Sequence, residues 1–218
     1  MTEPARILLV DDDPFTLMML TSTLRSLGFI DVTAKRSITE AVSYAQQSQP
    51  TVAVLDLDLG EGPTGIDLAH RLRQLHPSIG IIILSTYAEP RLIGSNQRPL
   101  PSSAVYVVKQ SIADTDALLT AIELCARNTD IDVTHVRRAS PIGTLKDSQV
   151  EVMRLVASGM TNAQIAETMV MREESIEKAI ARLIKQLGIK ASSRQNQRVL
   201  IALAYYRLIK GANETADI

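Results

Sequence analysis

Residues 6–13 read RILLVDDD, a short run of branched apolar residues that stops at three consecutive aspartates. A continuous apolar run of this length is typical of a strand that is buried on both faces of a parallel sheet. Three further runs stop just as abruptly: residues 51–55 (TVAVL) at Asp56, 80–84 (GIIIL) at Ser85 and 104–108 (AVYVV) at Lys109. Four predicted strands thus end at a charged or hydroxyl-bearing residue.

Segments with apolar residues at helical spacing separate these strands. We expect helices at 15–27, 38–47, 64–75 and 115–127, and a further strand at 31–34. This alternation predicts a doubly wound, flavodoxin-like α/β domain with five parallel strands. One helix is in doubt, because Pro90, Gly94, Pro99 and Pro101 occupy the segment where the fourth is due. We expect that helix to be missing or broken.

A second, all-α domain is predicted after residues 128–143, which lack sustained periodicity. Four helical patterns follow without strands, at 147–157, 162–169, 173–187 and 193–210. A short helix, a tight turn and a longer helix are typical of a helix-turn-helix. The predicted organisation is a first domain at 1–127, a linker at 128–143, a helical domain at 144–211 and a tail at 212–218.

Composition narrows the class of protein. A single cysteine excludes an intramolecular disulfide framework, and no apolar run approaches the roughly 18 residues of a membrane span. We expect a soluble, cytoplasmic protein that does not associate with a membrane. Charge is asymmetric: residues 1–129 carry 10 Lys and Arg against 14 Asp and Glu, whereas residues 144–210 carry 11 against 6. A basic second half suggests a polyanionic partner for that domain.

The polar residues at the strand ends form the first candidate site. The carboxyl ends of parallel strands meet at one edge of a sheet, so the aspartates at 11–13 should lie close to Asp56. Converging carboxylates need a counter-ion, and hard oxygen ligands suit Mg²⁺. A metal-bound carboxylate near the Ser85 hydroxyl and the Lys109 ammonium is suited to phosphoryl transfer.

The motifs ILLVDDD, VLDLDL, IILST and VYVVK resemble the receiver domain of two-component response regulators over about residues 5–127. The resemblance implies a partner, a sensor histidine kinase, and a cofactor, Mg²⁺. It implies these roles: Asp56 is the phosphoacceptor, Asp11 and Asp12 are the metal-binding pair, Asp58 supplies a main-chain carbonyl to the metal, Ser85 is the switch hydroxyl, Lys109 contacts the phosphoryl group and Tyr106 is the aromatic switch. For Tyr106, a half-exposed strand aromatic is an equal alternative.

Asp56 and Asp58 also resemble the nucleophile motif of haloacid-dehalogenase-type phosphatases, in which the second aspartate is a general acid. In those enzymes the motif opens the chain, and further acidic residues follow later strands. Here an aspartate triplet precedes it and no acidic pair follows. We therefore expect that the protein is not an enzyme. Its chemistry should be limited to self-phosphorylation from small donors and autodephosphorylation.

The second half resembles the LuxR-type helix-turn-helix domain over about fifty residues, in QVEVMRLVASG, the turn at 159–162, IAETM and SIEKAIARLIKQLG. The expected contacts with double-stranded DNA are Thr161, Asn162, Ser175, Lys178, Arg182, Lys185 and Arg194, with Arg198 as a further phosphate contact. Glu173, Glu174 and Glu177 repel phosphate and point to altered specificity, weaker affinity or both. The last helix offers a homodimer surface at Val199, Leu200, Leu203 and Tyr206, or it packs on the first domain.

Together the two resemblances predict a response regulator of the NarL/FixJ type, whose DNA binding is controlled by phosphorylation of Asp56. Two alternatives stay open. One is a DNA-binding regulator of the same architecture that acts without phosphorylation, which the altered fourth-helix segment favours. The other is an interaction adaptor that has lost DNA binding, which the glutamates of the recognition helix favour.

Overall fold

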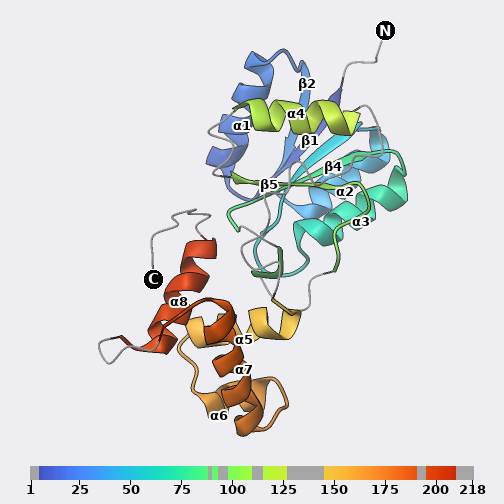
Figure 1. Ribbon diagram of the computed structural model, residues 1–218. Helices are drawn as coiled ribbons and strands as arrows, with labels where there is room; N and C mark the ends of the chain where they lie inside the picture. The colour runs from blue at the N-terminus through green and yellow to red at the C-terminus, as the bar shows by residue number, and fades with distance from the viewer. Residues whose placement is uncertain are drawn as a thin grey trace. The chain divides into compact units, whose positions relative to one another are not determined.

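A computed structural model describes residues 5–87, 90–92, 98–109, 115–126, 145–190 and 195–209 of the chain, without the side chains of 115–117. The chain divides into two compact units (Figure 1). The first, here called the sheet unit, comprises Met1–Ser85 and Arg98–Arg138. The second, the helical unit, comprises Thr86–Gln97 and Ala139–Ile218.

Five parallel strands form the centre of the sheet unit. They are β1 (Arg6–Val10), β2 (Asp31–Lys35), β3 (Val52–Asp56), β4 (Gly80–Ser85) and β5 (Val105–Val108). Their order is β2-β1-β3-β4-β5, and all neighbours pair in parallel. Every residue of β3 and β4 is buried, as their unbroken apolar runs predict. The prediction of a doubly wound five-stranded sheet is confirmed.

Helices cover both faces of this sheet. They are α1 (Pro14–Ser26), α2 (Ile38–Gln47), α3 (Gly65–Leu75) and α4 (Thr115–Ala126). Buried residues of α1 and α4 share one apolar cluster with the strands, including Leu20, Leu24, Leu118 and Ile122. In Figure 1, α2 and α3 lie on the other side of the sheet. All four helices start and end within two residues of their predicted positions.

Between β4 and β5 the described residues contain one short helical element, the 3₁₀ helix η1 (Pro90–Leu92). The expectation of a missing or broken fourth helix is therefore confirmed for this part of the chain. Proline has no backbone N–H and clashes with the preceding turn of a helix, so the three prolines of this segment oppose a regular helix. The three residues of η1 belong to the helical unit.

Four α-helices form the rest of the helical unit: α5 (Asp147–Ala157), α6 (Asn162–Thr168), α7 (Glu173–Gln186) and α8 (Gln197–Ile209). The last helix starts later than predicted. The sequence predicted a start at Ser193, whereas α8 starts at Gln197. Asn196 caps it: its side-chain Oδ1 accepts a hydrogen bond from Arg198 N at 2.9 Å and its carbonyl accepts one from Leu200 N at 3.1 Å. Asparagine is favoured at such a cap.

Among the described residues, no helix is long and apolar enough to span a membrane. The longest of them, α7, has 14 residues, whereas a span takes about 20.

Candidate functional site

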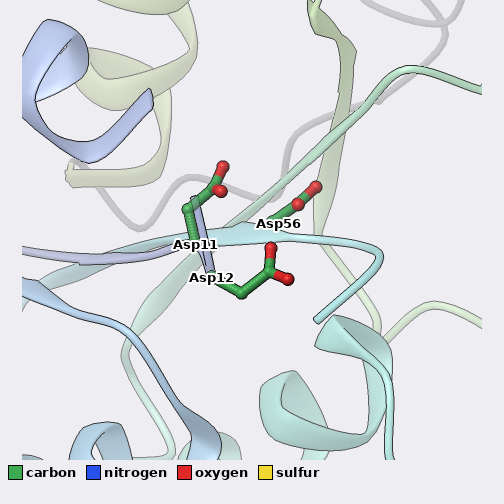
Figure 2. A group of neighbouring side chains, drawn as sticks. All are labelled: Asp11, Asp12 and Asp56. Carbon is green, nitrogen blue, oxygen red and sulfur yellow. The ribbon is translucent and has the colours of Figure 1, made fainter. Parts of the chain in front are cut away.

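The predicted carboxylates come together at the edge of the sheet. Val10 pairs with Leu55 in the register of β1 and β3, so Asp11 lies beside Asp56. One oxygen from each of Asp11, Asp12 and Asp56 lies within 4.8 Å of the others. Asp11 and Asp56 are buried, with 2% and 7% of their surfaces exposed, whereas Asp12 is exposed. Figure 2 shows the three side chains at the ends of neighbouring strands.

Lys109, which directly follows β5, neutralises part of this charge. Its Nζ lies 2.8 Å from Asp11 Oδ2 and 3.1 Å from Asp56 Oδ2. Burial lowers the pKa of Lys109, but the two carboxylates outweigh burial and the net effect raises its pKa. The lysine is therefore cationic throughout the neutral range, and its ammonium is held between two of the three carboxylates.

Burial raises the pKa of Asp56 to about 6, and the charge of Asp11 adds to this rise. Lys109 and the backbone N–H of Asp58 act in the opposite direction. Burial disfavours the charged form of a carboxyl group, and a nearby like charge does the same. Asp56 is thus mostly ionised above neutral pH, although its pKa is well above that of an ordinary aspartate.

The strand register also brings Ser85 to this edge. Asp56 pairs with Leu84, so Ser85 lies one residue further along the neighbouring strand. Ser85 in turn pairs with Val108, the residue before Lys109. Its side chain is buried, with 1% of the residue exposed. The order of strands β1, β3, β4 and β5 therefore gathers the predicted polar residues along one edge.

Tyr106 lies in β5, two residues before the strand ends, and pairs with Ile83. It is buried, with 6% exposed. The alternative of a half-exposed strand aromatic is therefore wrong. Asp58, by contrast, is exposed, and its Oδ1 accepts a hydrogen bond from Gly60 N at 3.4 Å.

The third aspartate of the triplet has a different task from its neighbours. Asp13 is the N-cap of α1, and its side chain accepts hydrogen bonds from Phe15 N and Thr16 N at 3.1 Å. The hydrogen bond from the Thr16 hydroxyl lowers the pKa of Asp13, and that from Phe15 N adds to the effect. The signal in the sequence is Pro14, because proline is favoured at the first position of a helix, directly after the cap.

Gly65, at the start of α3, belongs to the site although it was not among the predicted site residues. A Cβ atom on Gly65 would lie 1.9 Å from the carbonyl oxygen of Asp56 and 2.9 Å from its carbonyl carbon. Only glycine permits this approach, because any side chain would displace the backbone of Asp56. The turn from β3 to α3 thus fixes the main chain that carries Asp56.

In the helical unit, α7 presents one apolar and one charged face. Ile176, Ile180 and Leu183 are buried. The exposed residues of this helix include both the predicted DNA contacts and the glutamates that oppose them: Glu173, Glu174, Glu177, Lys178, Arg182 and Lys185. Ser175 is half-buried at the first turn. The surface of α7 is therefore acidic at its start and basic toward its end.

The predicted contacts around α6 make hydrogen bonds within the unit. Thr161 Oγ1 accepts from Gln164 N at 3.3 Å, which caps α6. Asn162 Oδ1 accepts from Arg198 Nη1 at 2.6 Å, and Arg198 also donates to the carbonyl of Met160. Arg198 thus holds the start of α6 in place, which the sequence analysis did not foresee. Arg194 lies outside the described residues.

The predicted dimer residues of α8 divide into two groups. Val199, Leu203 and Tyr206 are 54%, 48% and 48% exposed. Leu200 is half-buried and packs against the core of the helical unit. The exposed apolar surface of α8 therefore consists of three of the four predicted residues.

Each half of the chain matches a known protein family. The family described as "Response regulator receiver domain" matches residues 7–123, and that described as "Bacterial regulatory proteins, luxR family" matches residues 144–198. The first match covers more than half of the 218 residues. The chain belongs to the response regulator receiver domain family. It is a response regulator that carries a LuxR-type DNA-binding domain.

Curated relatives match this chain along most of their own length. The response regulator is 27% identical, over 197 residues, to the "DNA-binding transcriptional activator DevR/DosR" of Mycobacterium tuberculosis; the match covers 85% of this chain and 89% of that protein. It is 28% identical, over 201 residues, to a "Nitrate/nitrite response regulator protein homolog" of Haemophilus influenzae; this match covers 87% and 93%.

A solved structure supports the fold. RcsB from Salmonella enterica serovar Typhimurium, bound to promoter rprA in the presence of the phosphomimetic BeF3⁻, matches with a TM-score of 0.54 and 20% identity. The match covers 92% of this chain and 98% of that one. At this identity the likeness shows the fold alone.

Proposed function

We propose that this response regulator is phosphorylated on Asp56 by a sensor histidine kinase and that phosphorylation controls its binding to double-stranded DNA. The observation that carries the proposal is the buried carboxylate of Asp56, with Lys109 Nζ at 3.1 Å and two further aspartates within 4.8 Å. A nucleophile, a cation and a metal-ligand set in one place are what phosphoryl transfer requires.

In the proposed reaction an Oδ atom of Asp56 forms a bond to phosphorus. The bond between phosphorus and the kinase's histidine nitrogen breaks, and the imidazole leaves with that electron pair and takes up a proton. Asp56 reacts in its ionised form, which its pKa of about 6 makes available at neutral pH. Lys109 stabilises the negative charge that develops on the phosphoryl oxygens, because its ammonium already lies against Asp56.

The donor set fits Mg²⁺. Carboxylate oxygens of Asp11, Asp12 and Asp56 are hard ligands that lie within 4.8 Å of one another, and the main-chain carbonyl of Asp58 is the fourth proposed ligand. When bound, Mg²⁺ supplies positive charge to the phosphoryl oxygens. Ser85 is proposed as the switch hydroxyl that bonds to the phosphoryl group, with Tyr106 as the aromatic partner of the switch.

For DNA, we propose that α7 enters the major groove and that its exposed cations contact phosphates and base edges. The proposed contacts are Lys178, Arg182 and Lys185 on α7, with Thr161, Asn162, Ser175 and Arg194 around it. Val199, Leu203 and Tyr206 form the proposed homodimer surface, with Leu200 behind them. Paired half-sites on DNA suit such a dimer.

The predicted division into a receiver at 1–127, a linker at 128–143, a DNA-binding domain at 144–211 and a tail at 212–218 is retained as part of the proposal. Both family matches fall inside the two proposed domains, which supports it. A cytoplasmic location is proposed because the kinase and the DNA that the function requires are met there.

The test of phosphorylation is the intact mass after incubation with Mg²⁺ and acetyl phosphate. We expect a gain of one phosphoryl group in the wild-type chain and none in Asp56→Asn. Asp58→Ala should still gain the group, since only its main-chain carbonyl is required; loss of the gain in this variant would favour a general-acid role instead. Titration of a mixed-sequence duplex should then show salt-dependent binding that phosphorylation strengthens.

A regulator that acts without phosphorylation is the second candidate. The observation that favours it is η1, which takes the place of a regular helix between β4 and β5 in the described residues. Absence of the mass gain, from both acetyl phosphate and a kinase, together with intact DNA binding, would decide for this candidate. Absence of DNA binding under all conditions would favour the interaction adaptor.

A further inference from the structure

The segment that follows strand β4 is built into the hydrophobic core of the helical unit. Leu92, the last residue of η1, has none of its surface exposed and belongs to the same apolar cluster as Met153, Leu155 and Ile201. Tyr87 is partly buried against this cluster. A core residue of the DNA-binding half thus comes from the sequence of the receiver half.

Polar contacts hold the same segment to two helices. The hydroxyl of Tyr205 on α8 donates a buried hydrogen bond to the carbonyl of Leu92 at 2.8 Å. Arg91 Nη1 donates to the carbonyl of Leu145 at 2.7 Å and lies 3.1 Å from Asp147 Oδ1 at the start of α5. A buried hydrogen bond is costly to break unless both partners find replacements, so this attachment is specific as well as apolar.

The covalent chain makes this attachment relevant to the phosphorylation site. Ser85 is the last residue of β4, and only residues 86–89 separate it from Pro90 at the start of η1. The five residue steps from Ser85 to Pro90 span about 18 Å at most. The sequence therefore keeps η1 within a short, bounded distance of Ser85.

At the other end, the attachment reaches the helix that carries the proposed dimer surface. Tyr205 is buried with 7% exposed, and its ring makes an edge-to-face contact with the ring of Tyr206, 5.7 Å between centroids. Tyr206 is 48% exposed and is one of the three exposed apolar residues of α8. Direct contacts thus connect Leu92 to Tyr205, and Tyr205 to this exposed surface.

We propose that η1 (Pro90–Leu92) is a coupling segment: it carries the phosphorylation state of the receiver to α8 of the DNA-binding unit through the buried side chain of Leu92 and the hydrogen bond from Tyr205 to the Leu92 carbonyl. This inference rests on the proposed function, because it takes Asp56 as the phosphoacceptor and Ser85 as the switch residue. Coupling through such a contact requires that Leu92 has different interactions in the two states of the receiver.

The experiment uses the full chain and needs no operator sequence. Amide hydrogen exchange of α8 is measured by mass spectrometry with and without acetyl phosphate and Mg²⁺, and the intact mass is recorded on the same samples. In the wild-type chain we expect phosphorylation to change the exchange rates of α8 amides by about fivefold or more, the lower end of usual allosteric coupling. In Leu92→Ala we expect the mass gain to remain and the change in α8 to fall below about twofold.

Two further variants serve as an alternative and as a control in this experiment. Tyr205→Phe removes one hydroxyl and keeps the ring, and it should at least halve the response; it carries the test if Leu92→Ala fails to fold. Ile189→Ala truncates another buried residue of the same core, outside η1 and α8, and should leave the response at the wild-type level.

The outcomes separate the two proposals. A phosphorylated chain whose α8 does not respond, or a full response in both Leu92→Ala and Tyr205→Phe, overturns the coupling segment and leaves the phosphoacceptor standing. A wild-type chain that gains no phosphoryl group, either from acetyl phosphate or from a kinase, overturns the proposed function, and the coupling segment with it. A response lost in Ile189→Ala as well would assign it to general stability of the core and also contradict the proposal.

Discussion

The two units of this response regulator place their charges in opposite surroundings. In the sheet unit, Asp11 and Asp56 are nearly inaccessible to water and share the ammonium of Lys109. In the helical unit, Lys178 and Arg182 stand exposed on α7. Charges interact strongly where water is excluded and weakly where it is present. The difference teaches that the sheet site depends on its packing, whereas the surface of α7 depends mainly on which side chains its own sequence presents.

The largest expected effect is a loss of stability when glycine is replaced by alanine, compared between one glycine of each unit. Gly65→Ala places a Cβ 1.9 Å from the Asp56 carbonyl oxygen, so the backbone must move, and we expect a loss of about 3 kcal/mol or more in the free energy of unfolding. Gly159, with φ of 85° and open space around its Cβ position, should lose only about 1 kcal/mol on change to Ala. Urea denaturation of both variants measures this. Equal losses would break the comparison, because the sheet site would then be no more tightly packed than the turn after α5.

The second effect is the pH dependence that burial gives to Asp56. Its pKa is about 6 in the folded chain against about 3.8 for an exposed aspartate. The folded chain therefore binds a proton more tightly, and its stability falls as pH rises from about 4 to about 6 and stays lower above. Asp56→Asn removes this fall and should gain about 2 to 3 kcal/mol at pH 8 and almost nothing at pH 4.

Denaturation series across this pH range, in buffer with a chelator and no Mg²⁺, check the prediction. Asp58→Asn is the matched control, because its carboxylate is exposed and its removal should change stability by less than about 0.5 kcal/mol. A gain in Asp56→Asn that is the same at pH 4 and pH 8 would contradict an origin in the ionised carboxylate.

The third effect is local to the helical unit. Val170, in the turn between α6 and α7, has φ of 54° and 92% of its surface exposed. A left-handed conformation costs a branched L-residue about 1 to 2 kcal/mol, whereas asparagine tolerates it. Val170→Asn should therefore raise the free energy of unfolding by about 1 kcal/mol. Val170→Thr keeps the branched Cβ and should give no gain; a gain in thermal stability for Thr as well would show that backbone strain is not the cause.

The smallest effect concerns the charge of α7. Glu177→Gln removes one exposed negative charge from the proposed DNA-binding face, and we expect affinity for a mixed-sequence duplex to rise about two- to fivefold at low salt. The gain should shrink as salt is added, since solvent ions screen exposed charges. Glu61→Gln makes the same change of charge on an exposed loop of the sheet unit and should leave affinity unchanged. Equal gains in the two variants would mean that net charge, rather than the face of α7, sets the affinity.

Much of this structure could be predicted because local patterns and the fold agree. Unbroken apolar runs identified the buried strands, and the polar residues that end them identified the site, since parallel strands bring their carboxyl ends to one edge. The start of α8 at Gln197 could not be placed from periodicity alone, because residues 193–196 are all polar and only the cap at Asn196 marks where the helix begins. Nor could periodicity separate Asp13, which caps α1, from Asp11 and Asp12.

The sequence by itself determined the order of strands and helices, the residues that end the strands and the charge of each face of α7, because each of these follows from the identity of neighbouring residues. The tertiary structure decided which atoms meet: the contact of Lys109 with both Asp11 and Asp56, the need for glycine at position 65, and the burial of Leu92 in the same core as residues of α5, α7 and α8. These contacts join residues far apart in the chain. Their energies depend on burial and on distances between atoms, which exist only once the chain has packed.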